Sequence, residues 1–370
     1  MKKDHLNPLI NRKSLGSVDG IRPVFVSGVY RSSSTFLSAI IGCHEEYTAT
    51  SSIVKFPRFC LGRYDPIDNE ENYKKLIHES HKRVTTRWDI DFDAEGVLDD
   101  VAKRGVSYAT LYDSIMSHIL AANDGAAGTQ WIEKIAVMWS RIPEFLCMFP
   151  QGKVIHVLRD PRSVAASYKK MTNEPGATFL DAAFNTVHAI QSIEKFQKDL
   201  GNERIMLLRS EDLLISPEAN IRKICTFLDV PFSSRMLDPN TYGHIIGEDW
   251  RHNTSFHGEI KGFLPPSLRW RDTMTPAETM FIEMISQPYL AKYGYEADSH
   301  FPSKKDWDEI YGFLEDPFLR ERFEKWLHTG QGTEGYRTDP YLTEMKIVFP
   351  ERFEYHSNAS DKYRRKNLLD

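Results

Sequence analysis

The chain has 370 residues, of which 41% are hydrophobic, and this suits one large domain with or without an appendage. With 47 basic and 52 acidic residues the net charge is -5, so the basic excess typical of nucleic-acid binders is absent and any phosphate site must be local. Four scattered cysteines without metal-ligand spacing indicate reduced thiols. A polar N-terminus and the absence of any run of about 18 apolar residues predict a cytoplasmic protein without a membrane anchor.

Short apolar runs alternate with helical patterns along the first two thirds of the chain. Residues 23–27 (PVFVS) predict a strand, which leads through Gly28 and a small-residue turn into a helix that ends at Gly42. Three further runs predict buried strands at residues 131–135, 154–158 and 205–208. This alternation predicts an α/β fold with a central parallel sheet of about five strands, flanked by helices.

Several helices have clear start signals. Asp160 and Ser216 each precede a proline, and Thr275 with Glu278 forms a capping box. Residues 177–200 predict one long helix that ends before Gly201.

The composition becomes more charged and aromatic from Ser303 onward. We therefore expect a main domain over residues 1–302. Residues 303–370 are expected to form a C-terminal appendage packed on that domain, beginning with one amphipathic helix from Trp307 to Leu327.

Residues 28–37 (GVYRSSSTFL) join the first strand to its helix, and they suit a phosphate group. A loop in this place directs backbone N–H groups and the positive end of the helix dipole toward an anion. The hydroxyls of Ser32, Ser34 and Thr35 add donors. The loop lacks the second glycine and the lysine of the ATP-binding P-loop, because Ser33 and Ser34 stand there.

A second motif follows the strand at residues 154–158. Arg159 stands at the strand end, and Ser167 lies two turns into the next helix, so both side chains can reach one phosphate. The alternative is an arginine paired with a nearby carboxylate and a serine on a packed face. Asp160 is better used as a helix cap than as a magnesium ligand.

The two motifs together resemble those of sulfotransferases that use 3′-phosphoadenosine-5′-phosphosulfate (PAPS). Residues 28–37 resemble the loop G-x-x-R-S-G-[ST]-[ST]-x-L, with Ser33 in place of the glycine, and residues 159–167 resemble R-D-P-R-x-x-x-x-S. The segment from Arg209 to Pro231 also looks like a family stretch. Residues 268–271 (LRWR) are similar to a basic loop that covers the nucleotide, with Leu268 replacing its glycine. The resemblance covers residues 22–296.

The resemblance implies a PAPS-dependent sulfotransferase with PAP as the product and no metal. It implies that the 5′-phosphosulfate lies on Arg31, Ser32, Ser33, Ser34 and Thr35, that Arg159 and Ser167 bind the 3′-phosphate, and that Arg269 and Arg271 cover the nucleotide. Arg31 is the expected catalytic residue on the leaving side. Lys134 matches a family lysine that stabilises the transferring sulfuryl group.

The proton acceptor is not specified by the motifs, because Ala136 replaces the histidine that cytosolic family members carry. Glu133 is the first candidate for the general base, although strand alternation places it opposite Lys134. Glu46, His252 and His257 are the other candidates.

The acceptor is expected to be a hydroxyl or amine of a small molecule or sugar, with no nucleic-acid or membrane partner. The acidic run at residues 89–100 would favour a cationic acceptor if it lined the pocket, and is otherwise a solvated loop. Pocket-shaping residues are expected at Trp250, Asn253, Ser255 and Phe256. The alternative functions are a P-loop kinase-like phosphotransferase and a non-catalytic PAP-binding protein.

Overall fold

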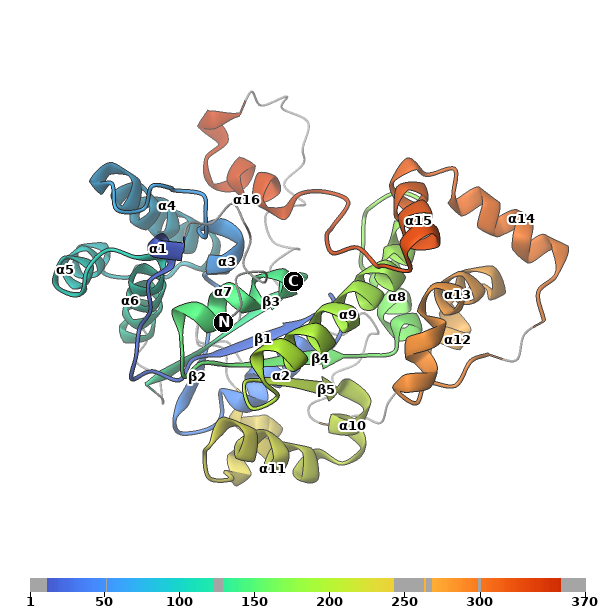
Figure 1. Cartoon of the computed structure of the whole chain (residues 1–370), viewed down its shortest axis with the longest axis horizontal. Helices are drawn as coiled ribbons and strands as arrows, with labels where there is room; N and C mark the ends of the chain where they lie inside the picture. The colour runs from blue at the N-terminus through green and yellow to red at the C-terminus, as the bar shows by residue number, and fades with distance from the viewer. Residues whose placement is uncertain are drawn as a thin grey trace.

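The structure is a computed structural model that describes residues 12–50, 52–122, 129–242, 263, 268–298 and 301–353. Its centre is a five-stranded parallel sheet in the order β2-β3-β1-β4-β5. The predicted α/β class and strand number are confirmed (Figure 1). The strands are β1 (Val24–Gly28), β2 (Tyr47–Ala49), β3 (Gln130–Ala136), β4 (Lys153–Leu158) and β5 (Ile205–Arg209).

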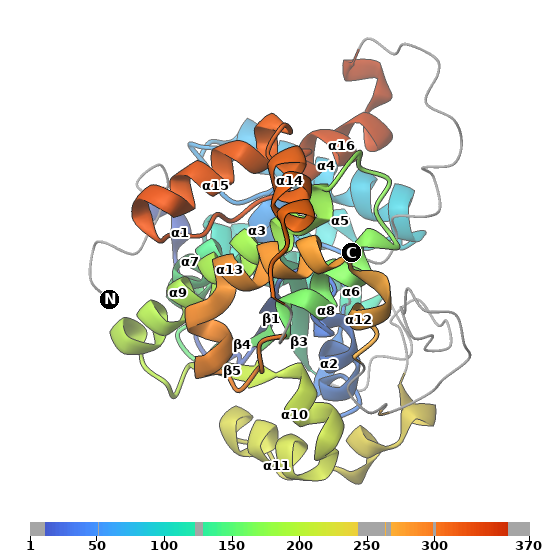
Figure 2. The same cartoon turned by 90° about the vertical axis from the view of Figure 1, so that its right-hand side faces the viewer.

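Alternation of side chains along the strands divides the core into two layers. Val24 and Val26 of β1 pack with α2 (Ser34–Ile41) and α11 (Pro217–Leu228) on one face. Phe25 and Trp131 pack on the other face, which α6 (Tyr108–Ala121), α7 (Ile142–Met148) and α9 (Ala182–Leu200) cover. Both faces are therefore buried, as a parallel sheet requires (Figure 2).

The remaining helices of the first 298 residues surround these layers. They are α1 (Arg12–Leu15), α3 (Phe56–Phe59), α4 (Glu70–Trp88), α5 (Ala94–Arg104), α8 (Pro161–Lys169), α10 (Ser210–Ile215), α12 (Trp270–Thr273) and α13 (Pro276–Lys292). In the described ranges, no helix combines the length and the hydrophobicity needed to cross a bilayer. All four cysteines are free thiols.

Most of the predicted helix starts are present. Asp160 accepts from the N–H of Arg162 at the start of α8, and Thr275 forms a complete capping box with Glu278 at α13. Ser216 precedes α11, but its side chain makes no capping bond. The long helix predicted at residues 177–200 is a short 3₁₀ turn, Thr178–Asp181, followed by α9.

The single helix predicted from Trp307 to Leu327 is wrong, because two helices occupy this segment. These are α14 (Lys304–Phe313) and α15 (Pro317–Thr329). Proline disfavours helical geometry at the residue before it, and Asp316 instead adopts extended backbone and caps α15 through the N–H of Phe318. The chain must therefore restart its helix at Pro317.

The segment between α15 and α16 (Pro340–Val348) crosses the molecule. Figure 1 shows it passing from α15 along α9 to α16, which lies beside α3 and α4. The N–H of Thr333 donates to the Phe184 carbonyl of α9 at 3.0 Å. A Cβ on Gly332 would lie 2.2 Å from that carbonyl oxygen, so only glycine permits this approach. We call residues 330–337 the crossing segment.

Candidate active site at the carboxyl edge of the sheet

The two phosphate motifs leave adjacent strands at the same edge of the sheet. Gly28 at the end of β1 pairs with Val157 near the end of β4. The loops that follow therefore start side by side, and each leads into the N-terminus of a helix, α2 or α8. Ligands of open α/β sheets bind at this edge.

Direct hydrogen bonds join the two motifs. Arg31 Nε donates to Ser167 Oγ at 3.1 Å, and an Arg159 guanidinium nitrogen donates to the Arg31 carbonyl at 2.7 Å. Burial lowers the pKa of Arg159, while Glu211 and Asp160 partly oppose that shift. A partly desolvated guanidinium gains from an anion that approaches it, so the arrangement suits a phosphate.

The loop backbone adopts an unusual conformation. Arg31 has φ 61° and Ser33 has φ 72°, both in the left-handed region. Ser33 stands where the resembling motif has glycine, and serine adopts this conformation at a cost of about 1 kcal/mol. Ser210 Oγ donates to Ser33 Oγ at 2.9 Å, which fixes the turn against α10.

Two hydroxyls in the loop, those of Tyr30 and Ser32, are buried without a hydrogen-bond partner among the described residues. A Cβ atom at position 28 would lie only 2.4 Å from Ser32 Oγ, so the place of this hydroxyl requires a glycine at Gly28. An unpaired buried hydroxyl is costly, and a phosphate oxygen would satisfy it together with the first N–H groups of α2. The residues present therefore fit a bound phosphate.

A cavity of about 240 Å³ opens beside the second motif. Arg159 and Ser163 line it from the β4–α8 side, and Ser210 from α10. The opposite side is formed by Trp270 and Tyr295. The cavity thus combines aromatic rings with cationic and hydroxyl groups, which suits a nucleoside carrying a phosphate.

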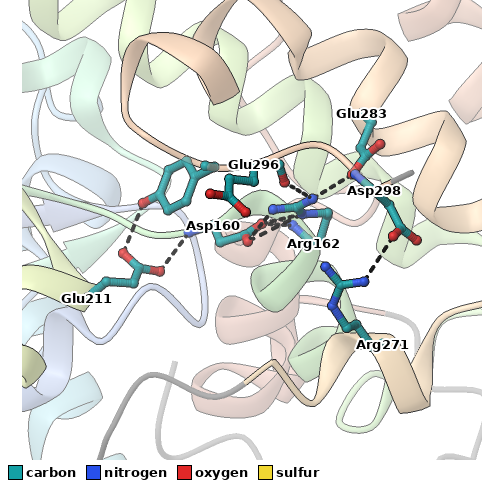
Figure 3. A network of polar contacts seen from close by, with 8 residues as sticks. Asp160, Arg162, Glu211, Arg271, Glu283, Glu296 and Asp298 are labelled. Carbon is teal, nitrogen blue, oxygen red and sulfur yellow. Dashed lines mark hydrogen bonds and ion pairs between the residues drawn. The ribbon is translucent and has the colours of Figure 1, made fainter. Parts of the chain in front are cut away.

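Arg162 also lines the cavity, but its guanidinium is already paired with two carboxylates. Its guanidinium contacts the Asp160 carboxylate at 2.8 Å and Glu283 at 2.5 Å (Figure 3). It lies 4.3 Å from the Trp270 ring centre. It also donates to the Glu296 carbonyl at 2.7 Å. Arg162 therefore ties α8 to α13 and to the segment after it.

Glu211 and Tyr295 are site residues that sequence reasoning did not identify. Glu211 accepts from the N–H of Asp160 at 3.0 Å and from the Tyr295 hydroxyl at 2.9 Å (Figure 3). Glu211 belongs to a stretch that carried a family resemblance, but no local pattern pointed to Tyr295. Burial raises the pKa of Tyr295, so its hydroxyl remains a donor.

The basic loop contributes one of its two arginines to the cavity wall. Arg271 lines the cavity, bonds to Asp298 at 2.9 Å and stacks 4.6 Å from the Trp270 ring centre. Arg269 is exposed at the start of α12 and is absent from the lining residues.

The structure does not support Glu133 as the general base. Its side chain is fully buried on the face opposite Lys134, and burial raises its pKa. Its carboxylate accepts from the Tyr112 hydroxyl and from the N–H groups of Lys55 and Phe56. The carboxylate therefore fixes the turn before α3.

Glu46, another candidate base, does not lie at this edge either. Glu46 precedes β2 at the amino end of the sheet and pairs with Arg22. This is the opposite edge from the phosphate motifs. His252 and His257 lie outside the described residues, as do Trp250, Asn253, Ser255 and Phe256.

The acidic run does not form a pocket. Asp93 caps α5 through the N–H of Gly96 at 2.8 Å, Asp91 pairs with His81 at 2.7 Å, and Asp100 accepts from Ser114 at 2.9 Å. These carboxylates lie among α4, α5 and α6, so the proposed basis for a cationic acceptor is missing. Within the described ranges, no group of three or more His, Cys, Asp or Glu side chains could hold a metal ion.

A family model described as "Sulfotransferase family" matches residues 23–234. This range contains both phosphate motifs and all five strands.

Two named relatives are similar to the chain in sequence. A protein-tyrosine sulfotransferase of Drosophila melanogaster is 22% identical over 218 residues, which are 58% of this chain but only 39% of that protein. Protein-tyrosine sulfotransferase A of Caenorhabditis elegans is 21% identical over 295 residues, 78% of this chain and 70% of the relative. A solved sulfotransferase domain from the curacin biosynthetic pathway aligns with a TM-score of 0.45 and 18% identity, covering 80% of this chain and 98% of that domain.

Proposed function

The chain belongs to the sulfotransferase family, and on that premise we propose that it transfers the sulfuryl group of PAPS to a hydroxyl or amine of an acceptor. The observation that carries the proposal is the meeting of the two motifs, in which Arg31 bonds to Ser167 and Arg159 bonds to Arg31. Two motifs of one nucleotide site must lie within the span of one ligand, and these are in contact.

Each motif has a separate task in this proposal. Arg159 and Ser167 hold the 3′-phosphate, which distinguishes PAPS from common adenine nucleotides. The β1–α2 loop holds the 5′-phosphosulfate through its amides, the unpaired Ser32 hydroxyl, and the side chains of Arg31, Ser34 and Thr35. The adenosine occupies the cavity beside Trp270, and Arg271 covers it.

The reaction needs an in-line arrangement and charge stabilisation. As the acceptor oxygen or nitrogen bonds to sulfur, the bond from sulfur to the bridging oxygen breaks, and its electron pair goes to the 5′-phosphate. Arg31 stabilises that growing charge on the leaving side. Lys134, which is paired in register with Val26 on the α2 face of the sheet, neutralises the oxygens of the transferring group. These steps use positioning and electrostatics, as phosphoryl transfer does.

For the acceptor we propose a small molecule. The crossing segment brings Tyr336 within 5.7 Å of the Tyr30 ring centre and 5.4 Å of Arg58, so the chain's own residues occupy the approach beside the loop. This also supports residues 303–353 as an integral part of the domain. The relatives named protein-tyrosine sulfotransferases make a tyrosyl peptide the competing acceptor.

Calorimetry in EDTA tests the nucleotide site, with PAP, 5′-AMP and ATP as ligands. We expect tight binding of PAP, and Arg159→Ala should weaken it about 100-fold because a charge-assisted phosphate contact is lost. Binding of 5′-AMP should change less than about threefold. Arg222→Ala, which removes an exposed pair with Glu218, is the matched control. ATP binding as tight as PAP, or an unaffected Arg159→Ala, would contradict the proposal and favour the kinase-like alternative.

Transfer from ³⁵S-labelled PAPS tests the reaction, with 2-naphthol, 4-nitrophenol, glucosamine and a tyrosyl peptide as acceptors. We expect labelled product with at least one small acceptor and little with the peptide. Labelling of the peptide alone would reject the small-molecule acceptor. PAP binding without transfer to any acceptor would favour the non-catalytic PAP-binding protein.

A further inference from the structure

Lys55 lies in a turn that the buried Glu133 carboxylate holds in place. The carboxylate accepts from the N–H groups of Lys55 and Phe56, the latter at 3.2 Å. The Lys55 backbone has φ 47°, in the left-handed region that residues other than glycine rarely adopt. Such conformations persist where surrounding contacts enforce them, and they gather at functional sites.

This turn stands at the carboxyl edge of the sheet, next to the phosphate loop. Ser52 Oγ donates to the Lys134 carbonyl at 2.6 Å, which joins the segment to the end of β3. The N–H of Val137, just beyond β3, donates to the Gly28 carbonyl at 3.0 Å, where the phosphate loop begins. Arg58 donates to the carbonyls of Ala136 and Val137. The α3 turn is therefore one strand away from the loop.

Lys55 directly precedes α3 and Arg58 lies within it, so both belong to this turn. The Lys55 ammonium is close enough to feel the charges of Arg58 and of Lys134 on β3. Arg83 of α4 adds a third positive charge, and Glu344 of α16 adds an opposing negative one. Burial is the largest influence, and together these groups lower the pKa of Lys55 to about 7.

We propose that Lys55 is the general base that takes the proton from the acceptor, and that Glu133 is the residue that positions it. In this step the acceptor O–H or N–H bond breaks as its heavy atom bonds to sulfur. The proton moves to Lys55 Nζ, while the electron pair of the broken sulfur–oxygen bond stays on PAP. Lys134 remains the cation at the sulfuryl group, so two neighbouring lysines have different tasks. This inference rests on the proposed function.

Competitive labelling with acetic anhydride tests the lysine without any acceptor. The protein is labelled with PAP bound at a series of pH values from 5.5 to 10, and each lysine is read by mass spectrometry. We expect half-maximal labelling of Lys55 near pH 7, with exposed Lys305 as the reference in the same digest. Labelling of Lys55 only at strongly alkaline pH, or at no pH, would overturn the proposal, because a base must be neutral and reachable.

Turnover tests the role in catalysis, with the best acceptor of the panel above. Lys55→Met and Lys55→Arg should each lower kcat about 100-fold or more, since arginine cannot give up its proton. The rise of kcat with pH through about 7 should disappear in both variants. Lys305→Met is the control. The affinity for PAP should stay within about threefold, because Lys55 is not assigned to the nucleotide.

Glu133→Gln separates the positioning role from a chemical one. The glutamine oxygen can still accept from the Lys55 turn, so we expect kcat within about fivefold of wild type and an intact pH profile. Loss of activity in Glu133→Gln equal to that in Lys55→Met would identify Glu133 as the base instead. An unchanged kcat in Lys55→Met, with PAP binding intact, would reject Lys55 as the base but leave the proposed function standing. If the wild-type protein does not bind PAP, the proposed function itself is rejected.

Discussion

Arg31 Nε donates to Ser167 Oγ across 3.1 Å, although 136 residues separate them in the chain. Arg31 lies in the loop after β1 and Ser167 lies in α8, which follows β4, and β1 and β4 are neighbours in the sheet. The contact therefore places the two phosphate motifs within reach of one nucleotide.

Ser167→Ala should weaken PAP binding about tenfold, because it removes a hydroxyl that bonds to Arg31 and that we assign to the 3′-phosphate. Calorimetric titration measures the change. Thr226→Ala, on the exposed side of α11, is the control and should leave the affinity unchanged. A PAP affinity in Ser167→Ala equal to that of wild type would show that Ser167 does not bind the 3′-phosphate.

Asp160→Ala should destabilise the protein by about 3 kcal/mol or more. Asp160 caps α8 and pairs with the buried Arg162 guanidinium, so its removal leaves a buried charge with one partner fewer. Denaturant unfolding measures the free energy. Asp160→Asn keeps the cap and should lose less, and equal losses in the two variants would show that the cap adds nothing.

Tyr336→Ala should lower stability by about 2 kcal/mol and PAP affinity severalfold. The Tyr336 ring contacts Tyr30 and Arg58, and Tyr30 directly precedes Arg31 in the loop. The Tyr30 ring also lies 4.2 Å from the ring of Tyr168, which follows Ser167. Thermal unfolding and PAP titration measure both effects.

Tyr336→Phe keeps the ring and should lose less than Tyr336→Ala. Tyr311→Ala, at a residue that is 66% exposed, is the control from the same C-terminal part of the chain. Normal PAP affinity in Tyr336→Ala would limit the crossing segment to a role in stability.

Acid should destabilise the protein through His156. Burial lowers the pKa of His156 to about 3, from 6.5 in an exposed histidine. The unfolded chain therefore binds the proton first, and stability that is complete above pH 6.5 is lost as the pH falls toward 3. The loss can reach about 4 kcal/mol.

Denaturant unfolding at several pH values measures this loss in wild type and in His156→Asn, whose amide can replace the ring nitrogen that faces Ser27. The variant should show a flatter pH dependence. His188, with a pKa lowered to about 4, acts in the same direction, and Asp181, with a pKa raised to about 7, acts in the opposite one. His188 and Asp181 are present in both the wild type and His156→Asn, so the difference between the two pH curves reports on His156. Parallel curves would contradict the assignment.

Local sequence patterns were sufficient for four of the five strands and for the two phosphate motifs. Those four strands are short apolar runs beside helices, and alternation with helices favours parallel pairing. The strand β2, Tyr47–Ala49, is not such a run and was not predicted. Arg31, Arg159 and Ser167 sit at fixed distances from strand ends, so the predicted fold placed them at one edge. Ser33 also follows its motif, since it adopts the conformation for which the family uses glycine.

Tertiary packing decided which polar side chains face the site. Glu133 and Lys134 are neighbours in sequence, but the pleat sends Glu133 into a layer where Tyr112 and the α3 turn take its oxygens. The acidic run is divided among caps and ion pairs on three helices, which its composition does not reveal. Lys55 carries no motif, and its altered proton affinity comes from burial and from charges on α3, α4, β3 and α16. These long-range neighbours exist only in the folded chain, because electrostatics and desolvation depend on distance in space and not on spacing in sequence.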